Sequence, residues 1–248
     1  MDVRVGCCGF PKARSKYYEY FKVVEVQQTF YQPPSPKTAE RWRVEAPADF
    51  EFTLKAWQLI THESRSPTYR RLSLSWPKGR LDHCGSFKPT DEVRWAWERT
   101  REVAITLKAR VVVFQTPPGF QPSPANKENF KKFFQEADRG DFLLVWEPRG
   151  PWSRDEIQEL CRELNLIHGV DPFKSDPSFG GVRYYRLHGV TGYRYRFGEE
   201  DLEFLWEKCR GKCYCLFNNV FMWMDALAFQ EFAGGGAESP RDSRMEGE

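Results

Sequence analysis

Short apolar runs alternate along this chain with longer segments in which apolar residues recur every three or four positions. The short runs are rich in β-branched and aromatic residues, which is typical of buried strands. They lie at residues 3–8, 23–28, 50–56, 110–115, 142–147, 164–170, 182–188 and 212–218. The longer segments predict helices at residues 36–46, 91–107, 127–137, 153–164, 199–209 and 221–232. Clusters of Pro, Gly and Ser separate the two kinds of segment.

The alternation of strands and helices predicts an α/β fold with a parallel sheet, because parallel neighbours need a crossover connection, usually a helix. Eight such units favour a closed barrel, so we predict a single (β/α)8 TIM barrel over residues 1–232. Its sixth unit is expected to be irregular, since residues 171–181 leave little room for a helix. The Gly-rich and charged residues 233–248 predict a disordered C-terminal tail.

Two of the predicted helices have recognisable start signals. Ser153 precedes Glu156 by the spacing of a capping box. Thr90 precedes Asp91 and Glu92, which place negative charge where the helix dipole favours it. We therefore expect each helix to begin directly after its cap.

The composition fits one globular domain of this class. Of 248 residues, 40% are hydrophobic and 29% are charged, which provides a large core and a well-solvated surface. The formal net charge is only +2, so an anionic partner must be met by a local patch of positive charge. No long apolar run predicts a membrane span, and the N-terminus lacks the pattern of a signal peptide. We expect a cytoplasmic protein without membrane contact.

Polar and ionisable residues recur where the predicted strands end. In a TIM barrel the C-terminal strand ends and the loops after them carry the catalytic groups. A purely structural barrel would fill these positions with Val, Ile and Leu, because unpaired buried charges are costly. We therefore predict one polar, cationic pocket at this rim, formed by Glu25, Lys55, Gln115, Glu147, Arg149, Arg186, His188, Asn218 and Asn219 with the loop residues Tyr31 and His62.

Four rim residues are predicted to be catalytic: Glu25, Lys55, Glu147 and His188. Lys55 would neutralise anionic oxygens, and Glu147 or His188 would move protons, since histidine titrates near neutral pH. The alternative interpretation is a structural ion-pair network inside the barrel mouth. The predicted substrate-binding residues are Tyr31, His62, Gln115, Arg149, Arg186, Asn218 and Asn219.

Two loops at the same rim combine arginine with aromatic residues. Residues 64–81 contain no acidic residue and include Arg70 and Arg71, and residues 192–197 include Arg194 and Arg196 between tyrosines. Guanidinium groups beside stacking aromatics suit phosphate esters and single-stranded nucleic acid. The alternative for either loop is a solvated basic surface. Together they predict a nucleic-acid contact through these four arginines.

We predict neither a metal nor a cofactor at this rim. The chain has only four histidines, and the cations Lys55, Arg149 and Arg186 would repel a divalent ion. No Gly-rich nucleotide-binding loop is present, which disfavours kinase and dinucleotide chemistry.

The seven cysteines do not predict a disulfide framework, because their number is odd and the chain is long enough to fold without disulfides. Cys213 and Cys215 alternate on a predicted strand and therefore face one side, and the strand beside it carries Cys7 and Cys8. Core packing is the favoured interpretation of these cysteines, and a redox or metal role is the alternative.

Six segments, in this order, resemble the DUF72 (YecE-like) family, in a thermophile-like or archaeal-like variant. They are VEVQQTFYQPPSPKTAERW, FEFTLKAWQLITH, VVVFQTPPGF, WEPRGPW, YYRLHG and LFNN. The resemblance spans about residues 5–229 and implies a TIM barrel whose activity is not established. It includes every predicted catalytic and substrate-binding residue. The chain departs from the family pattern at Cys7 and Cys8, where relatives have small hydroxyl residues, and at Val220, where relatives often have an acid.

Three functions remain open. The first is an enzyme, a hydrolase or lyase, that acts on a phosphorylated small molecule or nucleic acid at the C-terminal face of the barrel. The second is a non-catalytic DNA- or RNA-binding protein associated with repair. The third is a carbohydrate-active hydrolase that uses Glu25 and Glu147, although that reaction needs an unpaired acid and the nearby cations argue for paired ones.

Overall fold

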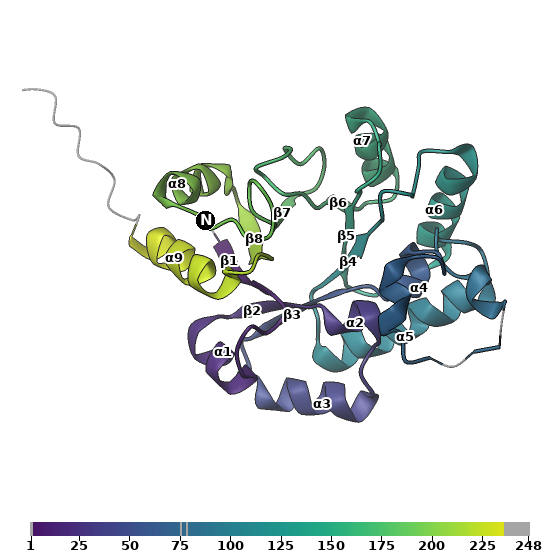
Figure 1. Cartoon of the computed structure of the whole chain (residues 1–248), viewed down its shortest axis with the longest axis horizontal. Helices are drawn as coiled ribbons and strands as arrows, with labels where there is room; N and C mark the ends of the chain where they lie inside the picture. The colour runs from purple at the N-terminus through teal and green to yellow at the C-terminus, as the bar shows by residue number, and fades with distance from the viewer. Residues whose placement is uncertain (1, 75, 78, 236–248) are drawn as a thin grey trace, which may run out of the picture.

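Eight parallel strands form one curved sheet with helices packed around its outside (Figure 1). The computed structural model describes residues 2–74, 76–77 and 79–235. The strands are β1 (Asp2–Cys8), β2 (Val23–Val26), β3 (Glu51–Lys55), β4 (Val111–Gln115), β5 (Leu143–Glu147), β6 (Ile167–His168), β7 (Val182–Leu187) and β8 (Lys212–Phe217). Their spatial order is β6-β5-β4-β3-β2-β1-β8-β7, with parallel pairing throughout. The predicted single TIM barrel is therefore confirmed.

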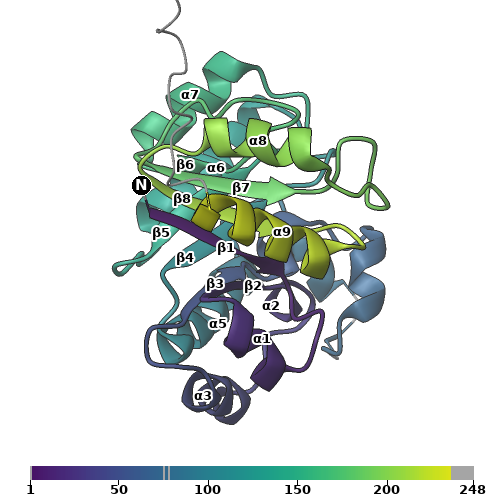
Figure 2. The same cartoon turned by 90° about the vertical axis from the view of Figure 1, so that its left-hand side faces the viewer.

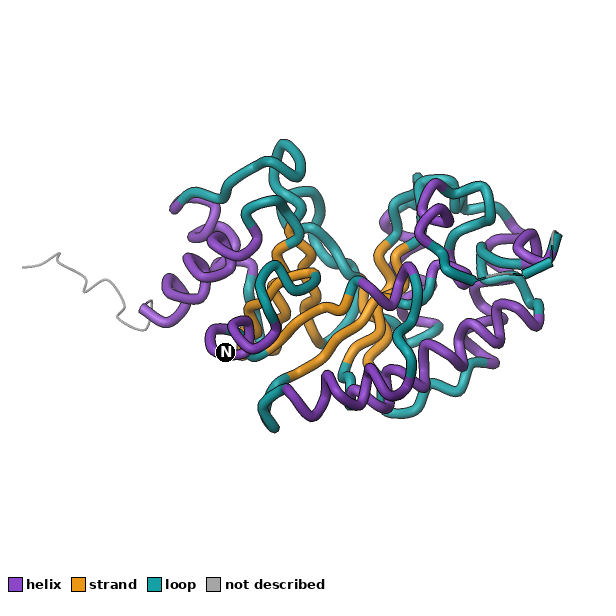
Figure 3. Tube along the Cα trace, turned by 60° about the horizontal axis from the view of Figure 1, so that its bottom comes forward, coloured by secondary structure: helices purple, strands orange, loops and turns teal. Residues whose placement is uncertain are grey.

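The helices follow the strands along the chain and lie outside them (Figure 3). They are α1 (Arg14–Tyr20), α2 (Gln28–Tyr31), α3 (Pro36–Glu45), α4 (Gln58–Thr61), α5 (Asp91–Leu107), α6 (Pro124–Glu136), α7 (Arg154–Glu163), α8 (Glu199–Lys208) and α9 (Met222–Gly235), with 3-10 turns η1 (Pro67–Arg71) and η2 (Arg80–His83). Helices α8 and α9 lie side by side over β8 and β1 (Figure 2). None of the helices in the described part of the chain has the length and apolarity that a membrane span requires.

All eight predicted strands and all six predicted helices are present, with ends shifted by a few residues. Both predicted caps are formed: the Thr90 side chain accepts from the backbone of Val93, and Ser153 forms a capping box with Glu156. The pattern missed the short helices α1, α2 and α4, of which α2 and α4 span only four residues each and show no apolar periodicity.

The C-terminal boundary needs a correction, because α9 continues to Gly235 and so includes residues 233–235 of the predicted tail. Residues 236–248, the rest of that predicted tail, lie outside the described residues.

The sixth unit is irregular, as expected. Strand β6 has two residues, and residues 169–181 connect it to β7 without a helix. The barrel closes there through an isolated bridge between Val170 and Tyr185. Two backbone hydrogen bonds hold it, from the N–H of Val170 to the carbonyl of Tyr184 (3.1 Å) and from the N–H of Arg186 to the carbonyl of Val170 (2.9 Å).

Separate clusters fill the inside and the outside of the barrel. The inner cluster is mostly aliphatic and contains the rings of Tyr184 and Tyr214, which are tilted by 40° to each other with centroids 5.5 Å apart. The outer cluster is larger and rich in aromatic residues, such as Phe114 and Phe130 between the sheet and α6. Because the inner packing ends near Tyr184, the strand ends beyond it are free to carry polar side chains.

Candidate functional site

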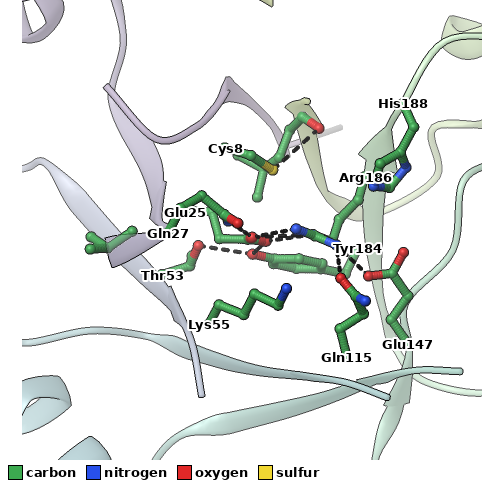
Figure 4. Close-up of polar contacts among 12 residues, drawn as sticks. Cys8, Glu25, Gln27, Thr53, Lys55, Gln115, Glu147, Tyr184, Arg186 and His188 are labelled. Atoms are coloured by element: carbon green, nitrogen blue, oxygen red, sulfur yellow. Dashed lines mark hydrogen bonds and ion pairs between the residues drawn. The ribbon is translucent and has the colours of Figure 1, made fainter. Parts of the chain in front are cut away.

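Arg186 on β7 lies at the centre of the polar side chains in the barrel mouth (Figure 4). Its Nε and Nη2 atoms bind both oxygens of Glu25 on β2, at 2.9 and 2.8 Å. Its Nη1 atom contacts the carboxylate of Glu147 on β5 and lies 3.4 Å from Oε1 of Gln115 on β4. Arg186 and Glu25 are completely buried. Residues from four strands thus meet in one polar network around Arg186.

Tyr184 forms the floor below this network. Its hydroxyl donates to Oε2 of Glu25 (2.9 Å) and lies 2.8 Å from Oγ1 of Thr53, which in turn bonds the carbonyl of Val24. Both oxygens of Glu25 therefore have several partners. This fixes the orientation of the carboxylate and of the guanidinium above it.

Glu147 is held as an anion by two arginines. Burial by itself would raise the pKa of this carboxyl, but the charges of Arg186 and Arg149 outweigh it and lower the pKa to about 2. The Nη2 atom of Arg149 donates to Oε1 of Glu147 at 2.6 Å. Arg149 follows β5 and is half-buried, so it connects the network to solvent.

His188 receives a hydrogen bond from the same arginine. Nη2 of Arg149 lies 2.8 Å from Nε2 of His188, and a guanidinium can only donate, so Nε2 is the acceptor. Nδ1 then carries the proton, 3.4 Å from Oδ2 of Asp171. Burial lowers the pKa of His188, although the hydrogen bond to Asp171 opposes the shift. The ring is therefore neutral at pH 7, with both nitrogens engaged.

Lys55 differs from every other charge in the mouth. Burial, and next the charge of Arg186, lower the pKa of its amine to about 7. Its Nζ atom lies 3.6 Å above the ring of Phe30, and within the described residues it has neither a hydrogen-bond acceptor nor a carboxylate partner. Lys55 is 7% exposed, and its Nζ keeps contact with accessible space. At neutral pH a large part of this amine is therefore uncharged.

His62 and Tyr31 pack against Phe30, the ring that Nζ of Lys55 contacts. The ring of His62 packs edge-on against Phe30 and accepts or donates a 2.8 Å hydrogen bond with Oγ1 of Thr61. Burial and the charge of Lys55 lower the pKa of His62 to about 3, so it is neutral. The ring of Tyr31 is half-buried, with the Arg71 guanidinium 3.6 Å from its centroid.

A cavity of about 660 Å³ opens beside this network, and sequence reasoning missed most of its lining. Lys12, Arg14 and Arg71 contribute positive charge and three glutamines contribute amides; among the residues that the structure describes, no carboxylate lines the cavity. Gln27 joins the cavity to the network, because its amide nitrogen contacts Oε1 of Glu25. The sequence signal that could have found this lining was the position of Lys12 in the loop after β1 and of Arg14 at the start of α1, at the same rim as the predicted site.

The two asparagines after β8 lie at the edge of the mouth. Asn218 is half-buried, and its backbone N–H bonds the carbonyl of Leu187 (2.8 Å). Asn219 is buried and donates to the carbonyl of Tyr195 and to Asp225, so it ties the loop after β7 to α9. Its Oδ1 atom lacks a partner among the described residues.

The arginines predicted to contact nucleic acid lie in two surface loops at this end of the barrel, on one side of the molecule in Figure 2. Arg70 is exposed on η1, beside Arg71. Arg194 and Arg196 line a hollow of about 520 Å³ in the loop after β7. Arg196 also approaches Asp225 at 4.0 Å.

All seven cysteines are free and buried. Cys8 lies beside the network, and burial, and next the charge of Glu25, raise the pKa of its thiol. The Sγ atom of Cys7 donates to the carbonyl of Met222 at 3.4 Å. Burial also raises the pKa of the Cys7 thiol to about 12, so neither thiol is ionised at neutral pH and neither is a thiolate nucleophile.

Comparisons with known proteins agree with this architecture. The model of the family described as "Protein of unknown function DUF72" matches residues 11–240. A crystal structure of a DUF72 family protein from Thermotoga maritima is 21% identical, with a TM-score of 0.68 over 94% of this chain and 100% of that one. One from Enterococcus faecalis is 17% identical, with a TM-score of 0.72 over 94% and 98%.

The fold likeness extends beyond that family. The structure of endonuclease IV from Thermus thermophilus is 12% identical, with a TM-score of 0.54 over 94% of this chain and 99% of that one. No curated protein matches the chain. At these identities the solved structures show the fold alone, so the chemistry has to be argued from the side chains.

Proposed function

The chain belongs to the DUF72 family, whose function is unknown, and on that premise we propose that it is a lyase acting on a phosphate-containing carbonyl compound. The observation that carries the proposal is Lys55, a buried amine with a pKa of about 7 and no acceptor among the described residues. An uncharged lysine is the nucleophile of enzymes that form imines with carbonyl substrates. Lys55 thus takes the catalytic role, and the charges around it hold the substrate.

The carboxylates favour lyase chemistry over hydrolysis. Glu25 is bonded at both oxygens to Arg186, and Glu147 is bonded to Arg186 and Arg149. With a pKa of about 2, Glu147 cannot donate a proton to a leaving group near neutral pH. The two-carboxylate mechanism of a carbohydrate hydrolase therefore lacks its acid.

The charges around Lys55 would stabilise the positively charged intermediate of imine chemistry at this amine. The free amine adds to the carbonyl carbon and water leaves as the iminium forms; the adjacent C–H bond then breaks, its proton passes to solvent, and its electron pair expels the phosphate group on the next carbon as an anion. Glu25 and Glu147 lie close enough to raise the pKa of Lys55, so they stabilise a positive charge at this nitrogen. The cationic cavity with Lys12, Arg14 and Arg71 offers a place for the phosphate group.

Borohydride trapping tests the proposal directly. The protein is incubated with ribose 5-phosphate, or with a single-stranded oligonucleotide that carries an abasic site, and reduced in place. We expect a covalent adduct that peptide mapping locates on Lys55. The yield should rise with pH through about 7 as the amine loses its proton.

Two variants make this test specific. Lys55→Arg keeps a positive charge but has no nucleophilic amine, and it should give no adduct. Lys37→Arg changes an exposed lysine on α3 and should react like the unchanged protein. Adducts spread over surface lysines, or undiminished in Lys55→Arg, contradict the proposal.

The second candidate is a non-catalytic DNA- or RNA-binding protein. It is favoured by Arg70, Arg194 and Arg196, three arginines on exposed loops at one end of the barrel. Binding to a single-stranded oligonucleotide that weakens steeply with salt would support it. Retained binding together with absence of trapping in both substrates would favour this candidate over the lyase.

A further inference from the structure

Three cysteine thiols meet between the barrel wall and α8, outside the candidate site. Cys213 and Cys215 alternate on β8 and point into the outer core, while Tyr214 between them points into the barrel. Cys209 directly follows α8, which lies over this part of the sheet (Figure 2). None of the three side chains is exposed. They lie near the N-terminal end of β8, and Lys55 and Arg186 lie near the C-terminal ends of their own strands.

The spacing of the sulfurs matches that of ligands around one ion. Sγ of Cys215 lies 3.6 Å from Sγ of Cys209 and 3.7 Å from Sγ of Cys213, and all three lie within 4.8 Å of one another. A point equidistant from the three corners of such a triangle is about 2.0–2.4 Å from each sulfur, which brackets a metal–thiolate bond of about 2.3 Å. The fold therefore brings the three ligand atoms to bonding distance of one common centre.

The donor set selects for a soft ion. Within the described residues, no histidine or carboxylate completes the group, so it offers three sulfurs. Structural zinc sites are almost always four-coordinate, whereas soft thiolates select Cu(I), an ion that readily accepts three sulfur ligands. We propose that Cys209, Cys213 and Cys215 form a binding site for one monovalent, thiophilic metal ion of the Cu(I) type.

The three thiols are completely buried, so a net charge on the cluster would be costly. Forming a metal–sulfur bond releases a thiol proton to solvent, and a monovalent ion that displaces one proton leaves the buried cluster uncharged. The Arg210 guanidinium, whose Nη1 donates to the carbonyl of Cys209 at 2.7 Å, supplies positive charge at the edge if a second proton leaves.

A short surface loop provides the entry route. Cys209 is followed by Arg210 and Gly211, both exposed, before β8 begins at Lys212. Gly211 has a φ of 61°, a conformation that glycine adopts without strain. These two exposed residues are the part of the chain next to Cys209 that lies nearest to solvent.

Titration of the full-length chain under anaerobic conditions tests the proposal. The probe is tetrakis(acetonitrile)copper(I), in competition with the chelator bicinchoninate. We expect one Cu(I) per chain, a sulfur-only coordination shell by X-ray absorption, and a higher Tm, because an ion that binds only the folded chain stabilises it. On the loaded protein, Cys209, Cys213 and Cys215 should resist alkylation, and the other four cysteines should not be protected by the ion.

The matched variants are Cys213→Ser and Cys161→Ser. Both replace a completely buried thiol, but Cys161 lies on α7 away from the cluster. Cys213→Ser should weaken Cu(I) binding by about tenfold or more, a loss of one ligand bond partly offset by solvation, and Cys161→Ser should leave it unchanged. The protection pattern on the unchanged chain keeps the test valid if Cys213→Ser does not fold. Copper lost to the chelator, equal protection of all cysteines, or preferential one-to-one binding of Zn²⁺ would overturn the proposal.

Discussion

Removing the charge of Glu25 tests whether the polar network of the barrel mouth is as tightly coupled as its contacts indicate. Glu25→Gln keeps the size and shape of the side chain but leaves Arg186 with only the Glu147 carboxylate. Both members of the broken pair are buried, with Arg186 1% exposed and Glu25 completely buried. Because a buried charge that loses its partner cannot regain its hydration, such a break costs about 3–5 kcal/mol.

Several contacts place the expected loss toward the upper part of that range. Glu25 accepts from two nitrogens of Arg186 and from the hydroxyl of Tyr184, and a glutamine amide can accept through only one oxygen. Its amide nitrogen would face the guanidinium, donor against donor. A domain of this type is stable by about 5–15 kcal/mol, so the variant should fold with a markedly reduced margin.

Urea unfolding followed by tryptophan fluorescence measures this loss. The control is Glu19→Gln, which removes an exposed ion pair with Lys16 on α1 and should cost less than about 1 kcal/mol. A double variant, Glu25→Gln with Arg186→Met, should recover part of the loss, since the uncompensated charge is gone. A cost for Glu25→Gln as small as that of Glu19→Gln would refute the picture of a desolvated, coupled network.

Two further outcomes follow from other contacts. The pKa of Lys55 is about 7 in the folded chain and about 10.4 in an unfolded one, so the unfolded chain binds more protons between those pH values, and the free energy of unfolding should rise with pH there by a few kcal/mol. Lys55→Met should be more stable than the unchanged chain at pH 7. If the free energy of unfolding had the same pH slope in both proteins, the low pKa would be contradicted. Gly189→Ala should destabilise the loop after β7, because Gly189 has a φ of 86° and an added Cβ would meet the carbonyl oxygen of Gly192 at 2.3 Å. Thermal unfolding and the protease sensitivity of the loop measure the effect. An unchanged Tm would contradict the prediction.

The helices and strands could be predicted from the local pattern of apolar and polar residues. Residues 91–107 were expected as a helix and α5 has those bounds, because its apolar stripe, its Thr90 cap and its acidic first turn all agree. Helix α6 begins at Pro124, three residues before the expected start, since Ser123 caps it and the apolar periodicity becomes visible only later. The irregular sixth unit could also be predicted from the sequence, because residues 171–181 have no helical periodicity.

The sequence predicted which residues gather at the candidate site, but it did not predict how they pair. That the charges of the barrel mouth gather at one rim follows from strand ends in a parallel barrel. Which of them pair does not follow from the pattern: Arg186 lies far along the chain from Glu25, and their contact depends on the curvature of the sheet. The roles expected for Glu147 and His188, which were to move protons, remain predictions, and both side chains are hydrogen-bonded to Arg149.

The amino-acid sequence by itself determined the barrel, because strand and helix periodicity, capping residues and the order of units are properties of neighbouring positions. It also determined that charge would collect at the C-terminal rim. Only the tertiary structure decided that Lys55 is desolvated and has no acceptor among the described residues, that a cationic cavity reaches Glu25 through Gln27, and that Cys209 meets two thiols of β8. Each of these three features depends on the distances between segments that are remote in the sequence and on the exclusion of water from between them. That exclusion of water in turn determines the pKa values, the ion pairs and the metal affinity.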